Sequence, residues 1–279
     1  MAGRLRIDLF GTMRVRLDDE PLPRLRSRKA KWLLALLALR GGEPVSRGHV
    51  AGMLWPDTDA KTALTNLRSV VSDLRRALGP QSERLRTPDR GTLAFDLRES
   101  GVDALAFDAA IRSGEPERAV ALYTGPLLQD CDEEWAVPER NARERACLDA
   151  FHRMTEAADP ERAVELARRA SEIAPWQDGP RRDLMNASFR AGDLNAALAV
   201  YRDFAQALRG ETGRTPDLQT TDLYVRLRSG TLPTPAAETP AGSSFPHPIT
   251  SFVGREDETL EVAEALRRHR LVTLVGLGG

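Results

Sequence analysis

The sequence contains little cysteine, lysine and histidine, and it has no long hydrophobic run. The longest apolar run, from Trp32 to Leu39, has eight residues, and a membrane-spanning helix needs about 20. The N-terminus, MAGRLRIDLF, lacks the apolar segment of a signal peptide. We therefore expect a cytoplasmic protein that contacts no membrane.

Only two cysteines are present, Cys131 and Cys147, and no histidine cluster flanks them. This count predicts neither a disulfide nor a zinc site. The four histidines are scattered along the chain, and none has the spacing of a catalytic dyad. We therefore expect no metal, no cofactor and no enzymatic activity in this chain.

The charge is divided unevenly along the 279 residues, which are enough for two domains and part of a third. Residues 1–98 contain 19 Lys and Arg against 11 Asp and Glu, whereas the remainder contains 21 against 30. A nucleic-acid-binding module joined to an acidic, partner-binding module is typically charged in this way. The alternative is a chance separation of charge on two solvated surfaces.

Residues 1–98 carry the pattern of a winged helix-turn-helix domain. Alternating residues predict strands over 4–10 and 12–17. Ser27 and Ser46 are the expected N-caps of two helices that end near Arg40 and Trp55. A third helix is predicted over 59–78, followed by a hairpin of 85–87 and 92–95 around the turn 88–91.

The third predicted helix has the composition of a DNA-reading helix. Leu67, Val71 and Leu74 recur at helical spacing and form a buried stripe. The opposite face carries amides, hydroxyls and guanidiniums, which pair with base edges and phosphates. With basic residues near the first helix and at the hairpin tip, the predicted DNA contacts are Arg26, Arg28, Lys29, Lys61, Thr62, Asn66, Arg68, Ser69, Ser72, Arg75, Arg76 and Arg90. The alternative is that this face is polar only because it is solvated.

Residues 99–230 predict an all-α domain, since no convincing strand follows Val102. A shift of 34 residues aligns the segment from Asp159 with the segment from Asp193, a period typical of tetratricopeptide-like helix pairs. A third copy from Glu115 is out of register, and a long helix over 135–157 would absorb the difference. The acidic run 132–134 is interpreted as a solvated helix start and not as a metal site.

The last 49 residues differ in composition from the rest. Residues 231–250 hold five prolines and predict a linker. Residues 251–279 predict the truncated start of a P-loop domain, of which only Gly276, Gly278 and Gly279 are present. The lysine that such a loop requires is absent. ATP binding is therefore expected only in a longer native protein.

Several segments resemble the Streptomyces antibiotic regulatory protein (SARP) family. SRKAKWLLALLAL, ALTNLRSVVSDLRRALG and LRTPDRGTLAFDL are similar to its OmpR-type winged helix, and ERAVALYTGPLLQDCDEEWAVPERNARER is similar to its bacterial transcriptional activator domain. FVGRE and LVTLVGLGG resemble the opening of the signal-transduction (NB-ARC/STAND) ATPases of larger members. The resemblance implies that Asn66, Ser69, Ser72 and Arg75 lie at the DNA. Asp73 departs from the pattern, because many members have a basic residue there.

The resemblance also implies a function. Its members are transcriptional activators, so we expect a homodimer that binds repeated half-sites in promoter DNA and recruits RNA polymerase through sigma factor and the alpha C-terminal domain. The expected fold is mainly α, a winged helix followed by tetratricopeptide-like helices. Two alternatives stay open. In the first, the chain is the regulatory front end of an ATP-driven switch enzyme. In the second, it is a tetratricopeptide scaffold whose basic domain binds protein.

Overall fold

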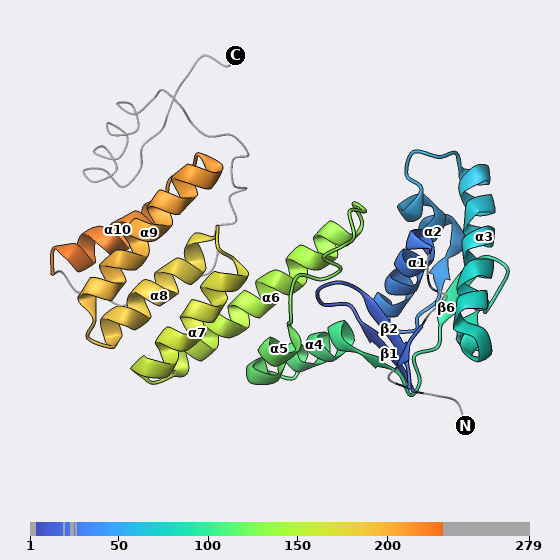
Figure 1. Ribbon diagram of the computed structural model, residues 1–279, viewed down its shortest axis with the longest axis horizontal. Coiled ribbons are helices and arrows are strands. Elements are labelled where there is room, and N and C mark those ends of the chain that lie inside the picture. Colours follow the sequence, from blue (N-terminus) through green and yellow to red (C-terminus); the bar gives the residue numbers. More distant parts are fainter. Residues whose placement is uncertain (1–3, 19, 23–24, 26, 231–279) are drawn as a thin grey trace, which may run out of the picture. The chain divides into compact units, whose positions relative to one another are not determined.

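A computed structural model describes residues 4–18, 20–22, 25 and 27–230 (Figure 1). The N-terminal elements are β1 (Leu5–Asp8), β2 (Arg14–Leu17), β3 (Glu20–Pro21), α1 (Arg28–Leu39), β4 (Val45–Ser46), α2 (Arg47–Leu54), α3 (Ala60–Leu78), the 3-10 helix η1 (Gly79–Arg84), β5 (Leu85–Arg86), β6 (Thr92–Phe95) and β7 (Gly101–Val102). The helical half consists of α4 (Asp103–Arg112), α5 (Pro116–Leu122), α6 (Ala136–Ala157), α7 (Pro160–Ile173), α8 (Asp178–Arg190), α9 (Leu194–Thr212) and α10 (Leu218–Arg228). The predicted linker and P-loop start, with Gly276, Gly278 and Gly279, lie outside the described residues.

The predicted mainly α fold, a winged helix followed by helical pairs, is confirmed. Three helices are followed by the β5–β6 hairpin, and the strands form two small sheets of order β3-β2-β1-β7 and β4-β6-β5. Three strands, β3, β4 and β7, were missed in the sequence. β7 pairs in parallel with β1, and β4 pairs with β6 through Val45 opposite Leu93 and Ser46 opposite Thr92. Each has two residues, too few for an alternating pattern.

Local signals in the sequence set the ends of the three N-terminal helices. The Ser27 hydroxyl accepts a hydrogen bond from the backbone N–H of Ala30, as expected for an N-cap. Asp59 caps α3 through two backbone N–H groups, and Gly79, with φ of 55°, ends it. Ser46 stands at the N-cap position of α2, but its side chain makes no capping bond. The prediction for that hydroxyl was wrong, because Ser46 is held by strand pairing with Thr92.

The helical half repeats one capped unit, as the 34-residue period predicts. The carboxylates of Asp159 and Asp193 each accept a bond from the backbone N–H three residues on, at the starts of α7 and α9. Ala163 and Ala197 are both fully buried, since small residues let the helices approach closely. The predicted long helix is α6, whereas Glu115 at the start of α5 makes no side-chain cap. In the described part of the chain, no helix combines the length and apolarity of a membrane span.

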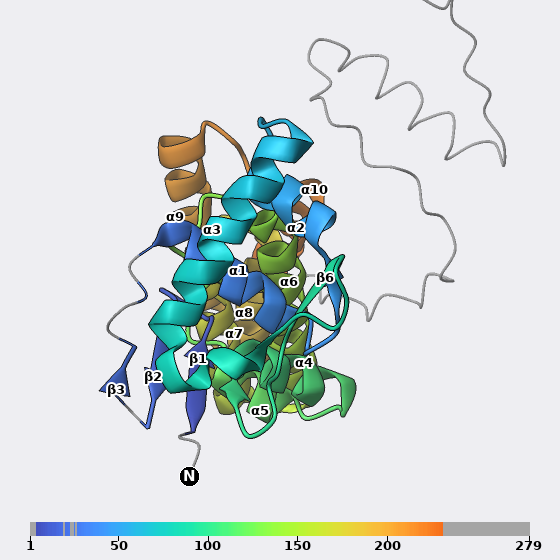
Figure 2. The ribbon, with the colours of Figure 1, turned by 90° about the vertical axis from the view of Figure 1, so that its right-hand side faces the viewer.

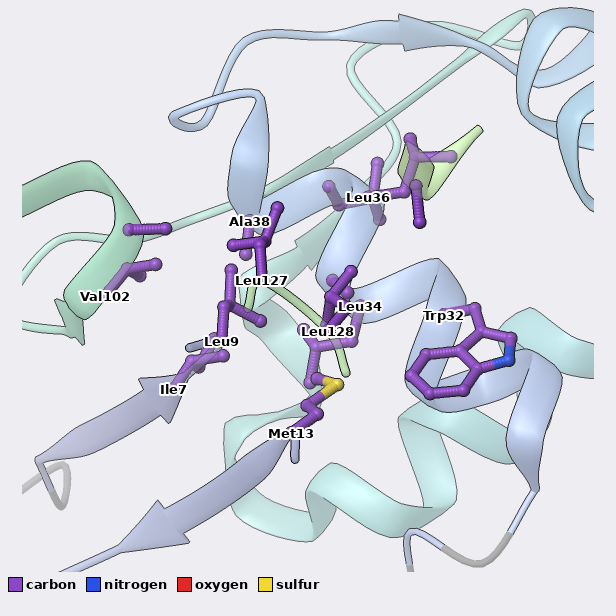
Figure 3. Close-up of a cluster of buried hydrophobic side chains, with 14 of the residues drawn as sticks. Ile7, Leu9, Met13, Trp32, Leu34, Leu36, Ala38, Val102, Leu127 and Leu128 are labelled. Atoms are coloured by element: carbon purple, nitrogen blue, oxygen red, sulfur yellow. The ribbon is translucent and has the colours of Figure 1, made fainter. Parts of the chain in front are cut away.

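The winged helix and the first helices of the other half share one hydrophobic core (Figure 3). Leu127 and Leu128 precede α6, yet both are fully buried in the same cluster as Leu9 and Leu34. Phe10 forms an isolated bridge with Leu127, and its ring also contacts those of Phe107 and Tyr123 at centroid distances of 5.3 and 4.9 Å. This continuous core ties the orientation of the winged helix to that of α4 and α6.

A half-buried carboxylate strengthens this junction. Asp103 opens α4, and its two oxygens accept the backbone N–H groups of Leu9 and Phe10 at 2.7 and 3.0 Å. Burial raises the pKa of Asp103, while these hydrogen bonds act against the rise. In the loop before α6, Arg140 of α6 donates to the carbonyl oxygens of Leu127 and Leu128. The Leu128 backbone N–H donates to the Leu9 carbonyl at 2.8 Å, so the two segments are held together through their main chains.

Candidate nucleic-acid interface

Helix α3 is amphipathic and lies on the side of the molecule that faces the viewer in Figure 2. Leu67, Val71 and Leu74 are buried against the other helices, as the sequence predicts. The predicted contact residues of this helix lie on the other side, where Asn66 is half-buried and the following are exposed: Lys61, Thr62, Arg68, Ser69, Ser72, Arg75 and Arg76. One helix therefore brings eight of the predicted residues together on one open surface.

Three guanidiniums converge between α3 and the hairpin. Arg75 donates to the Leu85 carbonyl and the Thr87 hydroxyl, both at 3.4 Å. Arg47, at the start of α2, donates to the same Thr87 hydroxyl at 3.3 Å. Burial lowers the pKa of Arg47, and repulsion from Arg75 and Arg68 lowers it further. Cations held together in this way favour an anion, since an anion relieves their repulsion.

Arg47 is a candidate site residue that the sequence analysis missed. Its position depends on the pairing of β4 with β6, which brings the start of α2 against the hairpin. The backbone N–H of Arg47 donates to the Gly91 carbonyl at 2.8 Å and completes this contact. The one available signal was a basic residue directly after an expected N-cap serine, and such a residue is common on any surface helix.

The hairpin tip is built to present Arg90. The Asp89 carboxylate accepts the Gly91 backbone N–H at 2.7 Å and the Thr92 hydroxyl at 2.9 Å. These hydrogen bonds lower the pKa of Asp89, with the Thr92 bond contributing most. Arg90 lies between these anchored residues and is exposed. A fixed turn with an exposed arginine at its tip fits the narrow minor groove.

Arg28 and Lys29 have partners in the helical half. Lys29 Nζ lies 2.8 Å from the Glu133 carboxylate and 5.6 Å from the centroid of the Trp55 ring. Arg28 lies 3.4 Å from the Asp132 carboxylate. Their contact with DNA stays a prediction, and the third residue of this group, Arg26, lies outside the described residues.

The acidic run 132–134 is therefore more than a solvated helix start. Two of its carboxylates pair with the winged helix, Asp132 with Arg28 and Glu133 with Lys29. Within the described ranges, no group of three or more His, Cys, Asp or Glu residues has the arrangement of a metal site. Cys131 and Cys147 are both buried as free thiols.

One ion pair on α3 opposes an excess of positive charge. Arg76 lies 3.0 Å from the Asp73 carboxylate, and both side chains are exposed. Replacing Asp73 by asparagine should release Arg76 and remove a negative charge from the polar face of α3. We expect tighter binding to DNA of any sequence, with a salt dependence steeper by about one unit of log K against log[salt]. Fluorescence anisotropy over a salt series measures both quantities, and an unchanged affinity and slope would place Asp73 away from the backbone.

Comparison with known proteins identifies the helical half. Residues 91–228 match the family model of the bacterial transcriptional activator domain. Regulatory protein AfsR of Streptomyces coelicolor is 27% identical over 315 residues, covering 100% of this chain and 31% of the relative. The chain thus carries a bacterial transcriptional activator domain and is similar to transcriptional regulators of the SARP family. The match to its activator domain begins inside the hairpin, where the shared core also runs across the junction.

Two further relatives agree. AfsR of Streptomyces griseus is 25% identical, with 95% of this chain and 30% of the relative covered. Transcriptional regulatory protein EmbR of Mycobacterium tuberculosis is 25% identical, with 76% and 60% covered. A structure of M. tuberculosis EmbR, in complex with a low-affinity phosphopeptide, matches with a TM-score of 0.59 at 21% identity, covering 82% of this chain and 66% of that one. The chain thus spans about a third of the length of the AfsR relatives.

Proposed function

We propose that this chain is a sequence-specific, DNA-binding transcriptional activator. The observation that carries the proposal is the convergence of Arg47, Arg68 and Arg75 beside the uncovered polar face of α3. In this proposal residues 1–98 are the DNA-binding domain and residues 99–230 the activator domain. The relatives support a regulatory and non-enzymatic role, because they are named as regulatory proteins.

The proposed mode of binding follows from the geometry of the two elements. α3 enters the major groove, where Asn66, Ser69 and Ser72 face base edges and the flanking arginines contact phosphates. The hairpin tip places Arg90 in the adjacent minor groove. The guanidiniums between the two elements neutralise the intervening backbone, and this contribution is the salt-dependent one.

Recruitment of RNA polymerase and dimerisation belong to the same proposal. A homodimer on repeated half-sites would read one half-site with each α3, and the spacing of the half-sites would report the geometry of the dimer. The activator domain supports such a role, because stacked helix pairs offer extended surfaces for protein partners. Sigma factor and the alpha C-terminal domain are the parts of RNA polymerase that we expect it to contact.

Selection from a random pool of double-stranded DNA at near-physiological salt tests the proposal. We expect recovery of a repeated half-site, and an affinity that falls steeply as salt rises. A scaffold that binds protein through its basic domain would instead enrich no sequence. The ATPase-front-end alternative is distinguished by a chain extended past residue 279, which alone would hydrolyse ATP.

A further inference from the structure

We infer that a groove between α2 and the start of the activator domain docks a basic polypeptide segment of a partner protein. The groove has a volume of about 580 Å³. One wall is the outer face of α2 and the other is the segment that leads into α6. Its lining includes Gly48, Gly52, Met53, Pro56, Glu134 and Trp135.

On the α2 wall, two glycines leave the main chain of the helix accessible to a partner. A Cβ placed on Gly52 would meet no atom within 4 Å, and one on Gly48 would meet only the Ser46 hydroxyl, at 3.7 Å. Two glycines one turn apart on a helix allow another backbone to approach closely. They also weaken α2, since glycine is unfavourable in a helix interior. A partner whose backbone packs closely against α2 would give these two glycines a role, whereas the fold itself gives them none.

The opposite wall contains a buried hydrogen-bond donor without a partner among the residues described. Trp135 is only 8% exposed, and its indole Nε1 has no hydrogen-bond partner in the described part of the chain. A buried polar group without a partner is costly, so a shift of the Trp135 ring that brings its N–H to an acceptor on a bound segment would be favourable. A backbone carbonyl is the acceptor that every polypeptide segment supplies.

The negative charge of the groove favours a positively charged partner. Glu133 lines it with one carboxylate paired to Lys29, and Glu134 adds a second that has no ion-pair partner among the residues described. Val137, 44% exposed, follows these acids in sequence at the start of α6 and adds an exposed apolar side chain there. This surface repels DNA and favours a lysine- or arginine-containing segment with an apolar side chain, since complementary charge steers association.

The groove also joins the two parts of the protein. Its α2 wall belongs to the winged helix, and its Trp135 wall belongs to the junction held by Lys29 and Glu133. A bound segment would contact both parts at once and strengthen their association. The partner would thereby favour one fixed orientation of α3 relative to the activator domain.

Panning the full chain with a phage-displayed library of random 15-residue peptides tests this inference. We expect the enriched peptides to carry net positive charge and at least one large apolar residue. Gly52→Phe places a large side chain in the groove from a Cβ position that meets no atom within 4 Å, and it should weaken binding of a synthetic enriched peptide at least about tenfold, or 1.4 kcal/mol. Gly210→Phe is the matched control, since Gly210 is also helical and open, and it should bind as the wild type does.

Two more variants test the contribution of the Trp135 N–H donor and that of the Glu134 charge separately. Trp135→Phe removes the indole N–H while keeping an aromatic ring, and Glu134→Lys reverses the charge. Each should weaken the peptide severalfold and leave DNA binding unchanged, so the result does not depend on the proposed DNA interface. Enrichment of acidic peptides, enrichment of none, or equal binding by Gly52→Phe would overturn the inference. A loss of self-association in Gly52→Phe would also overturn it, because a second copy would then be the occupant.

Discussion

Replacing Leu127 by alanine should lower the free energy of unfolding of the whole described unit by about 2–5 kcal/mol. Leu127 is fully buried and lies in the cluster that contains Leu9 and Leu34, so the substitution leaves a cavity in a core shared by the winged helix and the activator domain. Since each kcal/mol corresponds to about 2–4 °C in a unit of this size, thermal denaturation followed by circular dichroism resolves the change.

The decisive observation in this experiment is whether the two parts unfold cooperatively. Because the core is continuous, the winged helix and α4–α6 should unfold in the same transition, and Leu127→Ala should shift that transition as a whole. Leu218→Ala provides the control, because Leu218 is 88% exposed on α10, and it should change stability by less than about 0.5 kcal/mol. Separate transitions, with the activator domain melting at its wild-type temperature, would show that the two parts fold independently.

The elements that the sequence predicted well are those specified by neighbouring residues. Helix α3 is the clearest case, since its apolar stripe, its Asp59 cap and its Gly79 terminator all lie within 21 residues. The 34-residue period likewise predicted α7 and α9, because each repeat carries its own aspartate cap and buried alanine. Signals of this kind are complete within one helix and its ends.

The shared core could not be predicted in the same way. It depends on contacts between distant residues, such as Asp103 with the backbone of Leu9, and on β7, which has only two residues. Leu127 and Leu128 stand in a loop before α6, and an apolar pair in a loop has no periodicity to indicate what it packs against. The domain boundary drawn at residue 98 therefore crosses a core that continues on both sides.

In the candidate site, too, local features could be predicted from the sequence and long-range contacts could not. The face of α3 was predictable, because helical periodicity places Asn66, Ser69 and Ser72 opposite the buried stripe. The contribution of Arg47 was not, because it requires the pairing of β4 with the hairpin. The ion pair of Lys29 with Glu133 joins residues 104 positions apart, and charge alone gave no indication of it.

Arg75→Ala should cause the largest loss of DNA affinity among the single substitutions of the proposed interface. Arg75 lies on the exposed face of α3 and is held towards the hairpin by the Leu85 carbonyl and the Thr87 hydroxyl. If it reads a base, we expect a loss of about 1–3 kcal/mol, and relaxed preference at one position of the selected half-site. Removing it also removes a source of repulsion on Arg47.

Titrations of the selected site and of a scrambled duplex separate base reading from phosphate contact. Arg75→Ala should weaken the selected site more, whereas Arg90→Ala should weaken both to a similar extent, because the hairpin tip contacts the minor groove and backbone. Arg202→Ala, an exposed arginine of α9, is the control and should bind as the wild type does. Wild-type affinity in both Arg75→Ala and Arg90→Ala would move the DNA surface away from α3 and the hairpin. The activator domain would then hold the basic half in place for a protein partner, since the guanidiniums of Arg47, Arg68 and Arg75 would still favour an acidic one.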